Sequence, residues 1–278
     1  MEKKFNNNDE WIKELSNYII SKIKDIDKYK IINNKYISSI FLAWAPWAWK
    51  TEFLDTIFWE LKDTFIIIDI DEYRKFFIWY NWENSSDYQN SSVRVADKIL
   101  SYCFKQNLNF VFDWTFRNYN KVSQNFNQCK KYNRNSLITL IYQEPRISFY
   151  YTYLRKINKK RNVPIEVFID WFYYSIENAF KAIQEFSHSE LIIAHKKYNP
   201  LNKDNSKFLM DYKTNTIKKF SKKYRINYKN NEFKNKEKLM LDLKKFKDTL
   251  DVEFHWKWTL FWKLFIWIKE KIWKIRYF

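Results

Sequence analysis

The sequence predicts an α/β fold in which a mainly parallel sheet is flanked by helices. Short β-branched apolar runs alternate along the chain with longer segments of helical periodicity, a pattern typical of parallel sheets with right-handed crossovers. Two of these runs end in aspartates, and open α/β sheets bind ligands at the carboxyl ends of their strands. The 278 residues suffice for one such domain and a C-terminal extension.

The first half of the chain supplies three expected strands. Residues 9–28 place apolar side chains three and four positions apart, which predicts an amphipathic helix. Strands are predicted at 37–43, 64–69 and 109–113, the second being a β-branched run that suits a buried parallel strand. Helices are predicted at 51–62 and 91–106. The polar and aromatic stretch 73–90 is expected to be a loop. We expect strand 64–69 to lie next to strand 37–43.

The second half continues the alternation. Strands are predicted at 136–142 and 190–195, and helices at 148–160 and 164–186. Residues 161–164 separate the two helices because proline cannot continue a helix.

The basic charge is concentrated at the C-terminal end. Residues 201–278 hold 21 basic and 9 acidic residues, which is +12 of the net +18. We therefore expect residues 1–198 to form the α/β domain and residues 199–278 a basic C-terminal extension. Residues 234–250 have helical spacing. Residues 254–278, taken literally, read as a Trp-rich membrane-surface helix.

Composition limits the cellular setting. Cys103 and Cys129 are too few and too far apart to indicate a metal site, so two free buried thiols in a reducing cytoplasm are expected. The charged, Asn-rich start does not resemble a signal peptide. No run reaches the roughly 18 apolar residues of a transmembrane segment.

The stretch after the first strand carries the main motif. Trp44, Ala45, Pro46, Trp47, Ala48, Trp49, Lys50 and Thr51 occupy the strand-to-helix loop of a phosphate-binding P-loop, G-x-x-x-x-G-K-[ST]. Lys50 and Thr51 fit the pattern, but the two glycine positions hold Trp44 and Trp49.

Composition suggests an explanation of the mismatch. A chain of this length should contain roughly 19 glycines at a usage of about 7%. It contains none, and it contains 14 tryptophans. Reading Trp as Gly turns the loop into GAPGAGKT. We therefore interpret the tryptophans as glycines encoded by UGA in an AT-rich genome and translated as tryptophan. The alternative is a genuinely Trp-rich protein.

The first strands bring candidate catalytic groups to the loop. Lys50 is predicted to contact the β- and γ-phosphates of ATP, and the Thr51 hydroxyl to bind Mg²⁺. Asp71, 21 residues after Lys50, can accept the proton of a substrate hydroxyl; helix capping or a surface ion pair is the alternative. Asp69 competes for that role but is favoured as a loop or metal residue.

Later segments add candidates for the same cleft. Asp113 and Thr115 form a D-x-T arrangement after the third strand, where Asp113 orients metal-bound water or a substrate hydroxyl, or else caps the next helix. Arg117 follows closely. Arg155 and Arg161 flank the helix break, which suits a lid that brings positive charge to a transferring phosphoryl group.

Taken together, these segments resemble the zeta toxin family of P-loop kinases over roughly residues 10–195. The shared segments are WAPWAWKT at 44–51, IIDIDEYR at 67–74, VFDWTFR at 111–117 and KRNVP at 160–164. The resemblance implies ATP and Mg²⁺ as cofactors, UDP-N-acetylglucosamine as the phosphate acceptor and an antitoxin as protein partner. It further implies Asp71 as base, Arg161 on the phosphates and Asp97 as a sugar contact. Asp113 stands where the family usually has Glu, and the second lid cation is Arg155 or Lys156.

Two alternatives remain. One is another P-loop kinase of small molecules or of polynucleotide 5′-hydroxyls, since such enzymes share the loop, the base and the lid. The other is a non-enzymatic protein whose basic tail binds nucleic acid or a membrane surface.

The glycine interpretation predicts the chemistry of one tryptic peptide. Mass-spectrometric sequencing of residues 36–50 of the native protein should find glycine at positions 44, 47 and 49, and the coding DNA should carry UGA there. Tryptophan at these positions in the native peptide would contradict the interpretation.

Overall fold

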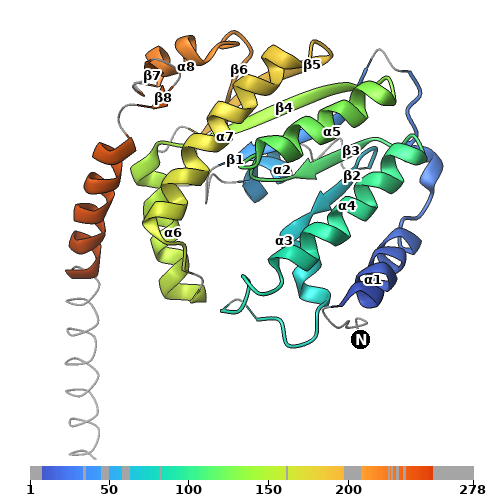
Figure 1. The fold of residues 1–278 in the computed structure, drawn as a ribbon, viewed down its shortest axis with the longest axis horizontal. Coiled ribbons are helices and arrows are strands. Elements are labelled where there is room, and N and C mark those ends of the chain that lie inside the picture. Colours follow the sequence, from blue (N-terminus) through green and yellow to red (C-terminus); the bar gives the residue numbers. More distant parts are fainter. Residues whose placement is uncertain are drawn as a thin grey trace, which may run out of the picture. The chain divides into compact units, whose positions relative to one another are not determined.

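The structure is a computed structural model that describes residues 8–33, 36–44, 50–57, 63–81, 83–160, 162–196, 208–224, 226, 228–229, 232–233 and 236–252. Its elements (Figure 1) are, in order, α1 (Asp9–Ser21), the 3₁₀-helix η1 (Ile26–Tyr29), β1 (Ile37–Trp44), α2 (Lys50–Ile57), β2 (Ile66–Asp69), α3 (Ile70–Tyr73), the 3₁₀-helix η2 (Arg74–Phe76), α4 (Gln89–Lys105), β3 (Phe110–Asp113), α5 (Tyr119–Lys131), β4 (Asn135–Tyr142), α6 (Pro145–Lys159), α7 (Ile165–Glu185), β5 (Ser189–Lys196), β6 (Phe208–Asp211), α8 (Ile217–Lys223), β7 (Tyr228–Lys229) and β8 (Glu232–Phe233).

The main sheet has the strand order β2-β3-β1-β4-β5-β6. Its first five strands pair in parallel, and β6 pairs antiparallel with β5. This arrangement confirms the predicted α/β class. The expected pairing of β2 with β1 is wrong, because β3 lies between them.

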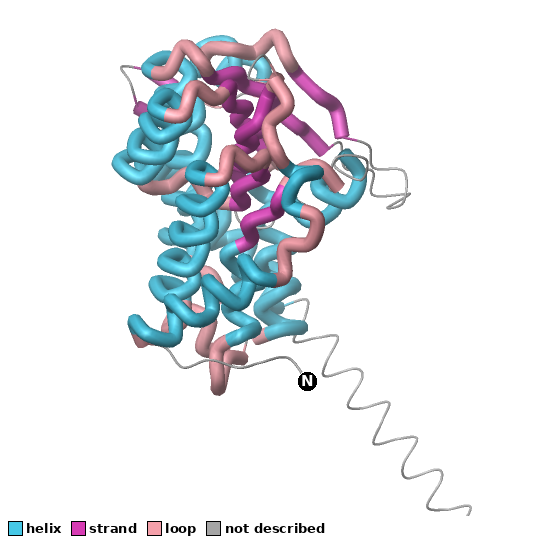
Figure 2. Tube along the Cα trace, turned by 90° about the vertical axis from the view of Figure 1, so that its right-hand side faces the viewer, coloured by secondary structure: helices cyan, strands magenta, loops and turns pink. Residues whose placement is uncertain are grey.

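Alternate residues of β1 face two different layers of helices. Ile40 and Leu42 pack with Phe53 of α2 on one face of the sheet. On the other face Phe41 contacts Phe126 of α5, with ring centroids 4.7 Å apart. Figure 2 shows the strands with helices on both sides. Because both faces are covered, the strands read as continuous apolar runs.

Arg134 ties β1 to the segment that leads into β3. Its guanidinium is buried, and its Nε donates to Ser39 Oγ at 2.8 Å. Nη2 donates to the carbonyl oxygens of Ser38 and Leu108 at 2.8 and 2.5 Å. The charge also lies 4.8 Å from the Phe110 ring centroid. Burial lowers the pKa of Arg134 to about 10, so the group remains charged at neutral pH.

Most predicted elements are present, with shifted ends. The first helix ends at Ser21 instead of continuing to residue 28, and Asp25 after it has the left-handed φ of 49°. Helix α2 begins where expected, whereas residues 58–62 lie outside the described residues. Sequence analysis missed α5, whose surface is largely polar, and the four-residue edge strand β6.

The described tryptophans lie outside the core. Trp11, Trp44, Trp79, Trp114 and Trp171 are all at least partly exposed, although tryptophan is highly buried on average. Trp79 is 84% exposed and has a φ of 67°, where a bulky residue is an outlier and glycine is not. Both observations support the glycine interpretation.

The chain divides into two compact units, Met1–Asn235 and Lys236–Phe278. The first unit includes β6 and α8, which lie beyond the boundary at residue 198 that the sequence led us to expect. In the second unit residues 236–252 are helical, and 253–278, with the expected Trp-rich segment, lie outside the described residues. Both cysteines are free and buried, as predicted. No described helix is long and apolar enough to cross a membrane.

Replacing Arg134 with Met should destabilise the fold by about 3 kcal/mol or more, because several buried acceptors lose their donor and each costs about 1–3 kcal/mol. Urea denaturation measures the effect. The matched control is Lys131→Met, an exposed neighbour that should change stability by less than about 0.5 kcal/mol. Equal stabilities of the two variants would contradict the structural role of Arg134.

Candidate functional site

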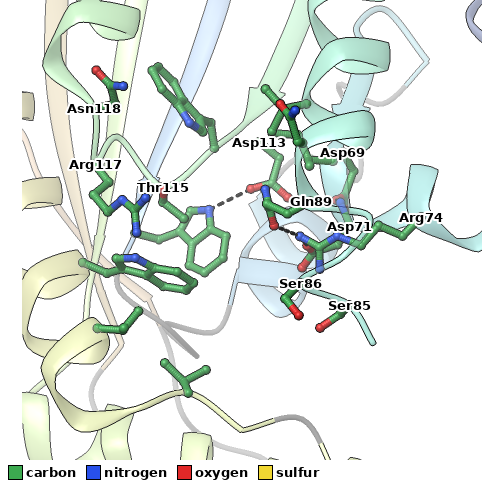
Figure 3. Close-up of a pocket in the computed structure, with 18 of the residues that line it drawn as sticks. Asp69, Asp71, Arg74, Ser85, Ser86, Gln89, Asp113, Thr115, Arg117 and Asn118 are labelled. Atoms are coloured by element: carbon green, nitrogen blue, oxygen red, sulfur yellow. Dashed lines mark hydrogen bonds and ion pairs between the residues drawn. The ribbon is translucent and has the colours of Figure 1, made fainter. Parts of the chain in front are cut away.

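A cavity of about 730 Å³ lies at the carboxyl ends of β1, β2 and β3 (Figure 3). This is the edge at which parallel α/β sheets bind ligands, and the volume is in the usual range of small-molecule sites. Its lining residues are Trp44, Asp69, Ile70, Asp71, Arg74, Ser85, Ser86, Gln89, Asn90, Val93, Asp113, Trp114, Thr115, Arg117, Asn118, Lys121, Asn162, Val163, Pro164, Val167 and Trp171. The structure thus brings together six predicted residues from three separate segments: Trp44, Asp69, Asp71, Asp113, Thr115 and Arg117.

The end of β2 orients Asp71. Asp69 is the N-cap of α3, and its Oδ1 accepts from the backbone N–H of Asp71 at 2.8 Å. The Asp71 carboxylate forms an ion pair with Arg74, with Nη2 and Oδ1 2.9 Å apart. Asp71 is partly exposed while Arg74 is buried. The buried guanidinium of Arg74 therefore holds the Asp71 carboxylate, which is still accessible from the cavity.

The loop after β3 has a fixed, unusual backbone. Phe116 has a φ of 58°, an uncommon value for a bulky residue. Asn178 of α7 donates its side-chain amide to the carbonyl oxygens of Phe116 and Arg117 at 2.7 and 3.0 Å. These bonds hold the strained turn and place Thr115 and Arg117 at the cavity. The cap of α5 is Asn118, so the capping alternative for Asp113 is wrong.

Three indoles occupy part of the cavity wall: Trp44, Trp114 and Trp171. The Trp44 N–H donates to Asp113 Oδ1 at 2.8 Å (Figure 3). The Arg117 guanidinium lies 5.7 Å from the Trp171 ring centroid. Glycine at these positions would enlarge the cavity and release Asp113 from the indole.

Two basic side chains also line the cavity, Arg117 in the loop before α5 and Lys121 of α5. Lys121 Nζ forms an ion pair with Asp97 Oδ2 at 2.7 Å. Asp97 itself is not among the residues that line the cavity in the described part of the chain. Asp97, the expected sugar contact, is therefore linked to the cavity wall by its ion pair with Lys121.

Other predicted residues are placed less completely. Residues 45–49 and Arg161 lie outside the described residues. Lys50 and Thr51 begin α2, as the motif predicts, but their side chains are not described. Arg155 lies in α6, and among the described residues it is not part of the cavity wall. The helix break is as expected, and Asn162, Val163 and Pro164 line the cavity.

Sequence analysis missed Arg74, Gln89 and Lys121. Arg74 follows Asp71 by three residues, the spacing at which helical side chains meet. That spacing could have indicated the pair. Gln89 and Lys121 come from distant segments, and no local pattern marks them.

The carboxylates suit a magnesium ion that is held partly by phosphates. Asp69 and Asp113 are directly opposite each other on β2 and β3, and Mg²⁺ prefers such oxygen ligands while using one or two carboxylates only. Within the described residues no group of three or more His, Cys, Asp or Glu side chains could hold a metal by itself. The donor set therefore fits a nucleotide-bound ion.

Residues 24–216 match the protein-family model described as Zeta toxin. No curated protein sequence matches the chain.

Solved structures show the same fold. One, from work on the PezAT chromosomal toxin-antitoxin system of the human pathogen Streptococcus pneumoniae, has 18% identity and a TM-score of 0.56, over 87% of this chain and 98% of the other. Two complexes of AvrRxo1-ORF1 with AvrRxo1-ORF2 are 11% identical. The complex with sulphate ions has a TM-score of 0.53 over 75% of this chain and 71% of the other. The complex with ATP has a TM-score of 0.51 over 71% and 65%.

Proposed function

Because the chain belongs to the zeta toxin family of P-loop kinases, we propose that it transfers the γ-phosphate of ATP to a hydroxyl group of a nucleotide sugar, UDP-N-acetylglucosamine. The observation that carries this proposal is the position of Asp71. It lies at the carboxyl edge of the sheet, in the cavity that begins where β1 leads into the phosphate-binding loop. A general base must be within reach of the hydroxyl that it deprotonates, and this position allows it.

The nucleotide belongs at the end of β1. With glycine at 44, 47 and 49, the loop can bring its backbone N–H groups close to the phosphates, at the N-terminus of α2. Lys50 places its charge on the β- and γ-phosphates. Thr51 and Asp69 hold Mg²⁺, which supplies charge neutralisation on the transferring group when bound. One similar structure was solved with ATP, which supports this nucleotide.

Asp71 accepts the proton of the acceptor hydroxyl. The hydroxyl oxygen forms the new bond to the γ-phosphorus, the bond to the β–γ bridging oxygen breaks, and ADP leaves with that electron pair. Arg161 and Arg155 are the cations that we expect to stabilise the charge that develops on the transferring phosphoryl group.

The proposed acceptor site uses residues at the end of β3, in the loop after it, and on α4 and α5. Asp113 and Thr115 orient the sugar, and Arg117 attracts its diphosphate. Asp97 contributes through its ion pair with Lys121. The mixed charge of the cavity supports an acceptor that has both hydroxyl groups and anionic groups.

Membership of the zeta toxin family also suggests a protein partner. One similar structure comes from a toxin-antitoxin system and others are complexes of two proteins, so we propose an antitoxin that holds this kinase inactive. The basic C-terminal extension remains a candidate nucleic-acid-binding segment.

Phosphate transfer from labelled ATP by the native protein, with glycine at positions 44, 47 and 49, tests the proposed reaction; this protein is the wild type in the comparisons of kinetics and stability. UDP-N-acetylglucosamine should be phosphorylated, and a 5′-hydroxyl oligonucleotide should not. Asp71→Asn should lower kcat by about 10²-fold or more while ATP still binds, because the base is lost and the phosphate site is not. Asp63→Asn, in an exposed turn, is the matched control. Transfer to the oligonucleotide alone would favour the polynucleotide kinase, whereas salt-sensitive DNA binding without any transfer would favour the binder.

Restoring glycine should restore the phosphate site. A variant of the printed chain with Trp44, Trp47 and Trp49 replaced by Gly should bind ATP about tenfold more tightly or better, since about 1.4 kcal/mol of relieved obstruction is a factor of ten. Calorimetry measures the affinity. Trp11→Gly, in α1, should give no gain in affinity and should cost stability of about 1 kcal/mol. Equal ATP affinity of the triple variant and the printed chain would refute the obstruction.

A further inference from the structure

Arg74 joins two parts of the cavity that are separate in sequence. Its side chain is 3% exposed, and Nη2 contacts Asp71 Oδ1 at 2.9 Å. The same nitrogen donates to the side-chain oxygen of Gln89, the first residue of α4 (Figure 3). One buried guanidinium therefore holds both the carboxylate and the start of the helix that follows the aromatic segment.

The segment between η2 and α4 is braced at its two ends. The Phe77 and Tyr88 rings stack with centroids 5.5 Å apart, and the Tyr88 hydroxyl donates to the Ile78 carbonyl oxygen at 2.8 Å. Ser85 and Ser86 of this segment line the cavity on the side of Gln89. An acceptor bound against these polar groups thus meets a surface that Arg74 connects directly to Asp71.

The Asp71–Arg74 ion pair differs from a surface ion pair because its guanidinium is buried. Glu72 and Lys75 form a pair at the same i,i+3 spacing in the same turn, but their side chains are 57% and 45% exposed. Exposed pairs contribute little. A desolvated guanidinium, with its rigid planar fork, holds a carboxylate in one geometry, and removing the partner charge from a buried pair is costly.

We propose that Arg74 is a positioning residue that fixes the Asp71 carboxylate relative to the acceptor wall formed by Ser85, Ser86 and Gln89. The inference rests on the proposed function in taking Asp71 as the base. Arg74 does not touch the reacting atoms: it sets the direction from which Asp71 meets the acceptor hydroxyl. Small displacements of a catalytic group can cost about 10²-fold in rate.

Steady-state kinetics separate this role from a merely structural one. Arg74→Gln should lower kcat about 10²-fold and leave the KM for ATP within twofold of wild type. Gln89→Met should raise the KM for UDP-N-acetylglucosamine with a smaller loss in kcat, because Asp71 keeps its guanidinium. Arg74→Lys should recover part of the rate, because lysine restores the positive charge but not the planar fork of the guanidinium. Lys75→Gln is the matched control and should behave as wild type. A kcat for Arg74→Gln equal to that of Lys75→Gln overturns the proposal.

Thermal denaturation tests the pair without any acceptor. Asp71→Asn should lower the melting temperature because Arg74 loses a charged partner, and adding Arg74→Gln should recover part of that loss. Strictly additive effects of the two substitutions overturn the proposal. This measurement also separates the two hypotheses: coupled stabilities with no phosphate transfer by the wild type mean that the proposed function fails while the Asp71–Arg74 link stands.

Discussion

The parallel pairing of β3 between β1 and β2 is the constraint on which the site depends. In this register Asp113 lies opposite Leu42 on one side and Asp69 on the other. Hydrogen bonds between parallel strands allow no independent shift of these ends, because a one-residue slip would turn Phe112 and Val111 to the wrong faces. Two carboxylates therefore end at one edge, beside the start of the phosphate-binding loop.

The tryptophans affect the fold and the phosphate site differently. The described core consists mainly of Phe, Ile, Leu and Val, with some Ala, Tyr and Cys. The described tryptophans lie at its margins, in the cavity wall or at the exposed turn of Trp79. A fold that depends on the core tolerates indoles at such places. A phosphate cradle does not, because it needs the backbone itself to approach the ligand. We therefore expect the chain as printed to fold as a P-loop kinase and tryptophan at positions 44, 47 and 49 to hinder phosphate binding.

Charged side chains of both signs line the cavity. Aspartates stand at the ends of β2 and β3, and Arg117 and Lys121 line the same cavity from the loop before α5 and from α5 itself. The carboxylates suit a cation and a hydroxyl, and the two basic side chains suit an anion. Buried Arg74 belongs to neither ligand and holds the Asp71 carboxylate in place.

Local structure and the phosphate-binding motif follow from the order of residues alone. Periodicity identified β1 to β5, α4, α6 and α7, and spacing joined Lys50, Asp71 and Asp113 into one expected site, since these signals arise from residues close together in the chain. The three-dimensional fold was needed to establish the strand order, the pairing of Arg74 with Gln89 and of Lys121 with Asp97, and the place of β6 at the sheet edge. The sequence also did not indicate α5, because its buried apolar residues Val122, Phe126 and Cys129 stand in an otherwise largely polar segment. The two side-chain pairs join residues 15 and 24 positions apart, and no local pattern specifies which distant segment a polar side chain will meet.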